Sequence, residues 1–467
     1  MILLLKKYTF KKINILKKTG SLALTLSFLC LFPFINLQAI PEYRVVIDPG
    51  HGGSNIRRKD DKWDPVSEQY LESYLPGMTY KNLTEHEVML QLARRVEYYL
   101  KLTETASGWE EFQKILETIS GSKEFPRIQF KTMMSREDSW NHRGLPANDI
   151  RTNAPYRLYD FPDPDDKSKI LPGRISAINN FQPHLVVSLH LNPAGKGNPG
   201  GMTAVLAPGY RTFDLLRKIT LKKASVKEFN KLPWSDKFLL SDRGWNHFQS
   251  ARADAWVYFH GYRCNKAGTA PWLEKNRGIR YNMVQWRYAD GPEWITEARK
   301  KGPGRFSMKY TDFEPEGSFF DRERSQAEAW RREDGPLGYG GDNHLASDEL
   351  LRFAQYGTRR FLNKKAEAIL GPIQQPYVST YAMPTFVNAI NAYLEIGHLN
   401  RSRDRALVIG QREVLAKSLA AGIYSLFVGL KPAQGKEPYR PRGTPVDFKK
   451  YENLPEGNYF EIVTKKK

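Results

Sequence analysis

The sequence contains only two cysteines, Cys30 and Cys264, among its 467 residues. Two cysteines cannot form a disulfide framework or a cysteine-based zinc finger. The sequence also lacks internal repeats, and its 35 glycines and 29 prolines follow no three-residue period, which excludes a collagen-like chain. Apolar residues make up 40% and charged residues 26%, so the chain is not of the disordered type. Its length predicts two or three structural units.

The N-terminal apolar run is too short to span a bilayer as a helix. Residues 22–35 form a run of about 14 residues, against the roughly 20 that a spanning helix needs. Six lysines and no acidic residue precede it, and Leu37-Gln38-Ala39 follows it as a small-residue cleavage site. This layout predicts a secretory signal at residues 1–39 and an exported protein of the periplasm or cell envelope. An uncleaved membrane anchor is one alternative. Lipid attachment at Cys30 is another, although the preceding Ser-Phe-Leu matches such a site poorly.

Positive charge exceeds negative charge, with 71 lysines and arginines against 51 acidic residues. A basic exported protein suits an anionic partner such as cell wall or lipid head groups, but solubility explains the charge equally well. The sequence contains no nucleic-acid recognition motif, and we expect no nucleic-acid partner. No dimerisation signal is visible, so a monomer is the default expectation.

Strand-like and helix-like segments alternate along the chain. This pattern predicts an α/β fold with a mixed, largely parallel sheet flanked by helices, formed by residues 40–208 and 340–430. We expect strands at residues 43–48, 127–134, 184–190, 201–207 and 393–396. We expect helices at residues 84–100, 174–180, 345–370 and 411–428. Thr84 and Glu87 have the spacing of a capping box at the start of the first helix.

Histidine and carboxylate side chains follow the ends of the predicted strands. His51 stands in the turn Pro-Gly-His-Gly-Gly directly after the first strand, and His190 ends another. Glu85 lies in the first turn of the helix that follows the first strand. Ligand sites in open α/β sheets form beyond the carboxyl ends of the strands, so these three residues are expected to meet there. Two histidines and one carboxylate, with a position left for water, form a catalytic zinc set. Glu395 ends a further strand and is the candidate general base.

Each of these residues also has a plain structural interpretation. His51 could serve the turn alone, and His190 could be a histidine satisfied within the core. Glu85 could simply complement the helix dipole, and Glu87 could replace it as a ligand. Glu395 is the hardest to explain structurally, because a lone buried carboxylate between Leu394 and Ile396 is costly unless it is paired or metal-bound.

Five segments, taken in order, resemble the motifs of the zinc-dependent N-acetylmuramoyl-L-alanine amidases of the amidase_3 type. They are VVIDPGHGG at residues 45–53, EHEVML at 85–90, MSRED at 134–138, RISAIN at 174–179 together with VSLHLN at 187–192, and LEIGHLN at 394–400. His398 stands where an aromatic residue is usual, and a serine replaces the threonine before Arg136. The intervals between the motifs are longer than expected for the family, and loop insertions at strand ends can accommodate such lengths.

The resemblance implies one Zn²⁺ held by His51, Glu85 and His190, with Glu395 as the catalytic base. It implies hydrolysis of the amide between N-acetylmuramic acid and the L-alanine of the stem peptide in peptidoglycan, in cell-wall remodelling or daughter-cell separation. Arg136 and Asn192 are expected to support the ligands or to contact substrate. Two rival functions stay open: zinc-dependent hydrolysis of another cell-wall amide, and a catalytically silent peptidoglycan-binding protein.

Residues 209–339 form a predicted inserted lobe with an excess of basic residues and seven of the ten tryptophans. The lobe could be a structural unit with its own core or a surface on which aromatic rings stack on sugars. It could also be a lid over the zinc site that an activator protein removes. Residues 431–467 are rich in proline, lysine and glycine, which predicts a flexible basic tail.

Overall fold

The structure is a computed structural model that describes part of the chain. The described residues are 39–52, 63–64, 69–70, 77–137, 161–162, 165–166, 169–193, 195–236, 255, 258, 318–379 and 381–461. The chain divides into two compact units, Met1–Pro41 and Glu42–Lys467, and the elements below belong to the second. The predicted signal segment up to residue 38, Cys264 and most of the predicted lobe lie outside the described residues.

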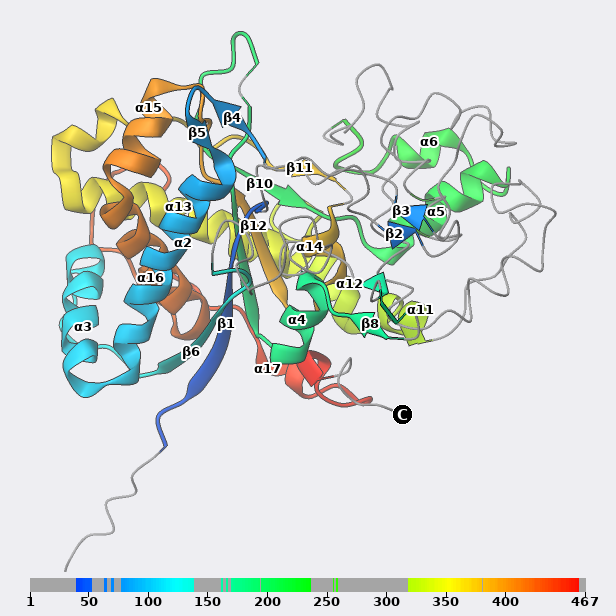
Figure 1. The fold of residues 1–467 in the computed structure, drawn as a ribbon, viewed down its shortest axis with the longest axis horizontal. Helices are drawn as coiled ribbons and strands as arrows, with labels where there is room; N and C mark the ends of the chain where they lie inside the picture. Colours follow the sequence, from blue (N-terminus) through cyan, green and yellow to red (C-terminus); the bar gives the residue numbers. More distant parts are fainter. Residues whose placement is uncertain are drawn as a thin grey trace, which may run out of the picture. The chain divides into compact units, whose positions relative to one another are not determined.

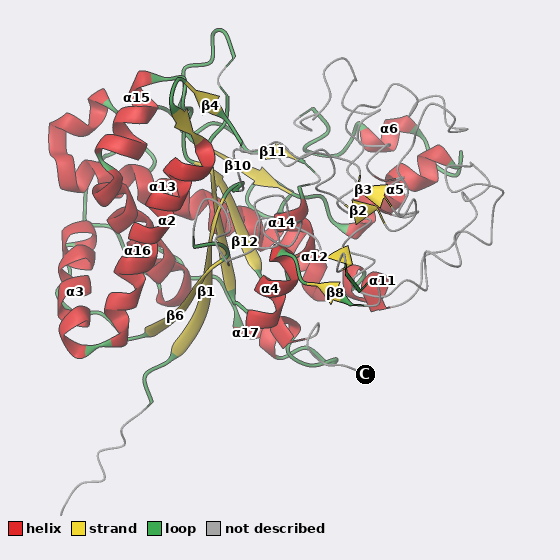
Figure 2. Cartoon of the chain, viewed as in Figure 1, coloured by secondary structure: helices red, strands yellow, loops and turns green. Residues whose placement is uncertain are grey.

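A six-stranded sheet forms the centre of the second unit (Figures 1 and 2). Its strand order is β11-β10-β12-β9-β1-β6. The strands are β1 (Glu42–Pro49), β6 (Gln129–Met134), β9 (Leu185–His190), β10 (Thr203–Leu206), β11 (Tyr377–Val378) and β12 (Ile390–Glu395). β6, β1, β9 and β12 run parallel, whereas β10 pairs antiparallel with β12. The predicted fold class, a mixed and largely parallel sheet flanked by helices, is confirmed.

Helices cover both faces of this sheet. Figure 1 shows α2 (Glu85–Lys101), α3 (Ala106–Ser120) and α16 (Arg412–Val428) on one side. It shows α4 (Arg174–Phe181) and α14 (Ala382–Phe386) on the other. The remaining α-helices of the described residues are α5 (Tyr210–Thr220), α6 (Val226–Phe229), α11 (Ser318–Glu323), α12 (Gln326–Arg332), α13 (Gly341–Leu362), α15 (Ser402–Arg405) and α17 (Lys449–Glu452). Short hairpins pair β2 (Trp63–Asp64) with β3 (Gln69–Tyr70), β4 (Thr79–Tyr80) with β5 (Leu83–Thr84), and β7 (Phe161–Pro162) with β8 (Ile170–Leu171).

The two faces of the sheet differ in character. Val45 and Ile47 of β1, like Leu189 of β9, point into one large apolar core shared with α2, α13 and α16. Because successive side chains of a strand alternate between faces, Asp48 and His190 point to the opposite face. The parallel strands therefore place their polar residues together on one face, at their carboxyl ends.

Two helices differ from the sequence-based expectation at their ends. Thr84 is the N-cap of α2 as predicted, but its hydroxyl donates to the Glu87 carboxylate at 3.0 Å instead of capping a backbone N–H. α13 begins at Gly341 after a left-handed Gly340 and ends at Leu362, where a 3₁₀ segment (Asn363–Ala368) replaces the predicted continuation.

Helix α3 was not predicted, although the sequence carries its signals. Thr105 accepts a hydrogen bond from the Gly108 N–H, and Gly121 ends the helix at φ +73°. The helix buries apolar side chains at helical spacing, including Trp109, Phe112 and Leu116.

The C-terminal segment is packed rather than flexible, so the prediction of a flexible tail was wrong for its described part, residues 431–461. Its buried side chains are Val446, Phe448, Tyr451, Leu454, Tyr459 and Phe460. Phe448 stacks on Phe427 of α16, with ring centroids 4.5 Å apart. The prediction weighed the prolines and lysines of the segment and overlooked its aromatic residues, whose burial stabilises an ordered path.

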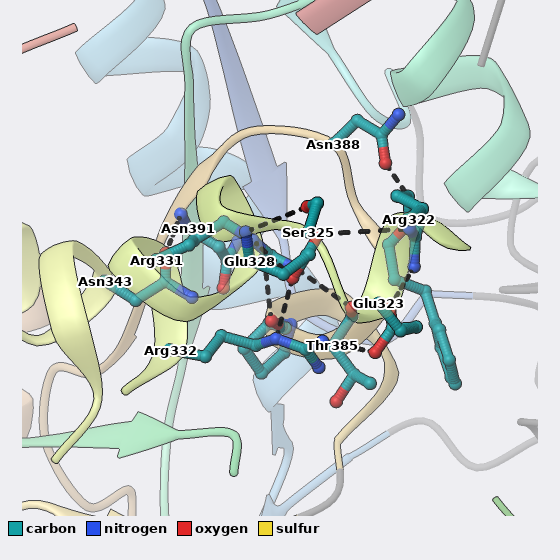
Figure 3. A network of polar contacts seen from close by, with 12 residues as sticks. Arg322, Glu323, Ser325, Glu328, Arg331, Arg332, Asn343, Thr385, Asn388 and Asn391 are labelled. Carbon is teal, nitrogen blue, oxygen red and sulfur yellow. Dashed lines mark hydrogen bonds and ion pairs between the residues drawn. The ribbon is translucent and has the colours of Figure 1, made fainter. Parts of the chain in front are cut away.

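A buried network of charged side chains joins α11 and α12 to the segment before β12 (Figure 3). Its ion pairs connect Arg322, Arg331 and Arg332 with Glu323 and Glu328. Arg331 also donates to the carbonyl oxygens of Pro384 and Thr385 at 2.9 and 3.0 Å, and Arg322 donates to Asn388 at 2.7 Å. The described end of the predicted lobe thus packs against α14 and the segment that leads into β12.

Candidate metal centre and catalytic carboxylate

The candidate site lies at the carboxyl ends of three neighbouring parallel strands. β1 ends one residue before Gly50 and leads into the turn that carries His51, while His190 and Glu395 are the last residues of β9 and β12. His190 and Glu395 are direct neighbours in the register of those two strands. Glu85 is the first residue of α2, and its side chain reaches the carboxyl ends of the same strands from that helix.

His51, Glu85 and His190 bring one ligand atom each to within 4.8 Å of one another. His51 Nε2 lies 3.3 Å and His190 Nδ1 lies 3.0 Å from Glu85 Oε1. Glu85 and His190 are buried, whereas the His51 side chain is 33% exposed, so the cluster opens on the His51 side. Two imidazoles and one carboxylate at this spacing can hold a divalent metal ion.

The carboxylate of Glu85 is held by backbone donors. Its Oε2 accepts from the Met78 N–H at 2.7 Å, and its Oε1 accepts from the Leu191 N–H at 3.0 Å. Burial alone would raise the pKa of Glu85, but the neighbouring His51 and His190 outweigh it and hold that pKa well below its usual range. Glu85 is therefore ionised, as a metal ligand must be.

Gly77 leaves the space in which this carboxylate meets His51. A Cβ at Gly77 would lie 2.5 Å from His51 Cδ2 and 2.6 Å from Glu85 Oε2, and the residue adopts φ +84°. A side chain at this position would displace the cluster, so glycine is required both for conformation and for space.

His190 is fixed in orientation by its neighbours. Its ring stacks on Tyr393 with centroids 4.4 Å apart. Gly50 lies so close to the same ring that a Cβ at this position would be 2.4 Å from His190 Nδ1. Burial lowers the pKa of His190, although Glu85 opposes the shift. The neutral imidazole that results is the form that binds metal.

Two buried arginines hold the turn that carries His51. Arg136 donates to the carbonyl oxygens of Pro49 and Gly50 at 3.1 and 3.0 Å and to that of His86 at 2.6 Å. Arg174 donates to the His51 carbonyl oxygen at 2.6 Å and pairs with the buried Asp48 at 3.2 Å. His51 itself has φ +58°, a left-handed conformation that such contacts must support.

Glu395 is buried beside the cluster and is bonded through one oxygen only. Its Oε1 accepts from the Tyr377 hydroxyl at 3.2 Å, and its Oε2 has no hydrogen-bond partner among the described residues. Burial raises the pKa of Glu395 well above its usual range, the charge of Glu85 raises it further, and the Tyr377 hydrogen bond opposes both. The Asn192 side-chain amide donates to the Tyr377 hydroxyl oxygen at 3.4 Å, and so it is linked to Glu395 through Tyr377.

The structure thus brings together the side chains of the predicted His51, Glu85, His190 and Glu395. Arg136 contacts the backbone that supports His51 and the start of α2, and Asn192 reaches Glu395 only through Tyr377. Glu87, the alternative to Glu85, is exposed and bonded to Thr84. His398 is buried and pairs with Asp404 at 2.9 Å.

Sequence reasoning missed the support given by Arg174, Tyr377 and Tyr393. Arg174 opens one of the recognised motifs, so its position carried a signal. Tyr377 lies in the two-residue strand β11, and nothing in its local sequence indicated a place beside Glu395.

Among the described residues, no helix combines the length and apolar character needed to cross a membrane. No family profile matches the chain. No curated protein matches it either.

Solved structures of N-acetylmuramoyl-L-alanine amidases are similar to the chain. Ami1 from Mycobacterium smegmatis is 12% identical, with 82% of this chain and 96% of that chain covered and a TM-score of 0.33. Ami1 from Mycobacterium abscessus is 10% identical, with 82% and 98% covered and a TM-score of 0.30. CwlD from Clostridioides difficile, solved in complex with the GerS lipoprotein, is 9% identical, with 82% and 96% covered and a TM-score of 0.29. At such identities and TM-scores the likeness carries no argument.

Proposed function

We propose that the chain is a zinc-dependent N-acetylmuramoyl-L-alanine amidase that acts on peptidoglycan. One observation carries the proposal: a cluster of two histidines and a carboxylate lies beside Glu395, a buried carboxylate with one oxygen that is unpaired among the described residues. The five motifs add the substrate class, because they resemble those of the amidases in order and in content.

The residues of the cluster fit zinc. Glu85 is ionised and His190 is neutral, and the set of two nitrogens and one oxygen is typical of catalytic zinc sites that keep a position open. His51, Glu85 and His190 would hold the ion. When bound, zinc polarises a carbonyl oxygen and lowers the pKa of a bound water towards about 7.

Glu395 would move the proton in the reaction. Its Oε2, which has no hydrogen-bond partner among the described residues, would accept a proton from the attacking water and return it to the amine nitrogen of the departing L-alanine. Burial raises the pKa of Glu395, which makes its carboxylate a stronger proton acceptor, and the positive charge of a bound zinc ion would favour the ionised form that accepts the proton. The scissile bond is then the amide between the lactyl group of N-acetylmuramic acid and the stem peptide.

Replacing the proton carrier tests this function. Glu395→Gln keeps the shape and removes the base, so we expect release of stem peptides to fall about 10²- to 10⁴-fold while one zinc per chain is retained. Glu87→Gln, which alters an exposed carboxylate of the same helix as Glu85, is the matched control and should keep full activity. Wild-type turnover by Glu395→Gln would contradict the proposal.

Export and an activator are further parts of this proposal. An amidase of peptidoglycan must reach the cell wall, which agrees with the export signal predicted at residues 1–39. An activator acting on residues 209–339 stays a prediction, because most of that segment lies outside the described residues.

A further inference from the structure

Three strand ends meet in a short chain of hydrogen bonds at Glu395. Asn192 follows β9, Tyr377 begins β11 and Glu395 ends β12. The Asn192 amide nitrogen lies 3.4 Å from the Tyr377 hydroxyl oxygen, and that oxygen lies 3.2 Å from Glu395 Oε1. The Asn192 backbone N–H donates to the Gly397 carbonyl oxygen at 3.0 Å, which fixes Asn192 beside the segment that follows Glu395.

The chemistry of the donors and acceptors fixes the direction of these two side-chain hydrogen bonds. An amide NH₂ group can only donate, so the Tyr377 oxygen accepts from Asn192 and the Tyr377 proton is left for Glu395 Oε1. Burial, and then the charge of Glu395, raises the pKa of Tyr377 well above its usual range, so the phenol keeps its proton and stays a donor. Oε1 of Glu395 is thereby occupied, whereas Oε2 has no hydrogen-bond partner in the part of the chain that the structure describes.

We propose that Tyr377, itself held by Asn192, is a positioning residue that fixes the Glu395 carboxylate so that Oε2 alone exchanges protons with the reacting groups. This inference rests on the proposed function of Glu395. A carboxylate with two free oxygens can rotate about its terminal bond, because sp³–sp² torsions have broad minima. A donor on Oε1 restricts that rotation and leaves Oε2 as the oxygen available for proton exchange.

The contacts of Tyr377 differ from those of a residue that only packs against its neighbours. Its side chain is partly buried at the edge strand, and its hydroxyl donates to a carboxylate whose other oxygen has no hydrogen-bond partner among the described residues. A purely structural tyrosine would affect folding or substrate binding when altered, whereas a positioning residue affects the chemical step.

Tyr377→Phe removes the hydroxyl and keeps the ring. With a soluble muramoyl-peptide as substrate, we expect kcat to fall on the order of 10- to 100-fold, the effect of one hydrogen bond to a charged group. KM and zinc content should stay unchanged. Tyr451→Phe is the matched control, because the Tyr451 hydroxyl also donates to a carboxylate, that of Asp342 at 2.6 Å, in the C-terminal segment. Its kcat should equal that of the wild type.

The double variant Tyr377→Phe/Glu395→Gln separates positioning from an independent role. If Tyr377 acts through Glu395, the double variant should be no slower than Glu395→Gln alone. The inference is overturned if Tyr377→Phe keeps the wild-type kcat, changes only KM, or slows Glu395→Gln further. Wild-type activity of Glu395→Gln would instead reject the proposed function itself, so the two failures are distinguishable.

Discussion

At the scale of single residues, the site depends on groups that never touch a substrate. Asp48 is fully buried, and Arg174 provides its charged partner while also bonding the His51 carbonyl oxygen. A buried ion pair adds little net stability over apolar residues, but loss of one partner leaves the other charge without compensation. The turn that carries His51 therefore needs both Asp48 and Arg174.

Arg174→Met should destabilise the protein by about 3–5 kcal/mol, because it leaves the Asp48 carboxylate buried without its arginine. Urea unfolding measures this. Adding Asp48→Asn to Arg174→Met should restore part of the loss, because the buried charge is then removed as well. Arg211→Met removes an exposed arginine that pairs with the partly buried Glu333, and it should change stability by no more than about 1 kcal/mol. An equal effect of Arg174→Met and Arg211→Met would contradict the account.

The residues of the site were predictable where they stand in motifs at strand ends, as His51 and Glu395 do. Tyr377 and Tyr393 were not, because their roles depend on which strands become neighbours. Tyr393 reaches His190 only because β12 pairs with β9 in one particular register. Register follows from long-range packing, which a single sequence does not display.

At the scale of elements, the C-terminal segment is part of the core at the amino end of β9. His184, just before β9, contacts Phe460 with ring centroids 5.0 Å apart. Its Nε2 lies 3.4 Å from Glu452 Oε1. Its Nδ1 accepts from the Arg44 N–H at 3.0 Å, which requires a neutral ring. Burial, followed by the charge of Arg44, lowers the pKa of His184 from 6.5 to about 4. The composition of residues 431–467 did not predict this packing. The burial of a few aromatic side chains stabilises a packed segment even though prolines and lysines are more numerous.

His184 should make the stability of the fold sensitive to mild acid. Between pH 6.5 and 4 the unfolded chain binds a proton at His184 that the folded protein does not. Stability from this residue is therefore complete above about pH 6.5 and decreases as the pH falls towards 4. We expect a loss of about 2 kcal/mol between pH 7 and pH 5. The measurement is urea unfolding at both pH values for the wild type and for His184→Gln. An identical pH dependence of the two proteins would contradict the assignment.

At the scale of the whole molecule, buried charges join segments that are distant in sequence. The arginines of α11 and α12 bind the segment that leads into β12, and Tyr459 donates to Glu328 of the same network (Figure 3). The strand that carries Glu395 is therefore held from one side by the end of the predicted lobe and by the C-terminal segment. The α/β class follows from the alternation of strand-like and helix-like segments along the chain. This network could not be predicted, because its members look like exposed helical charges until the fold buries them.

The most direct measurement is the identification of products released from purified peptidoglycan by the protein, with and without a metal chelator. The account predicts free stem peptides that begin with L-alanine. It predicts that their release stops with the chelator and resumes when zinc is added back. Release that continues unchanged with the chelator, or fragments cut at another bond, would contradict the assignment of His51, Glu85, His190 and Glu395 as a zinc amidase centre.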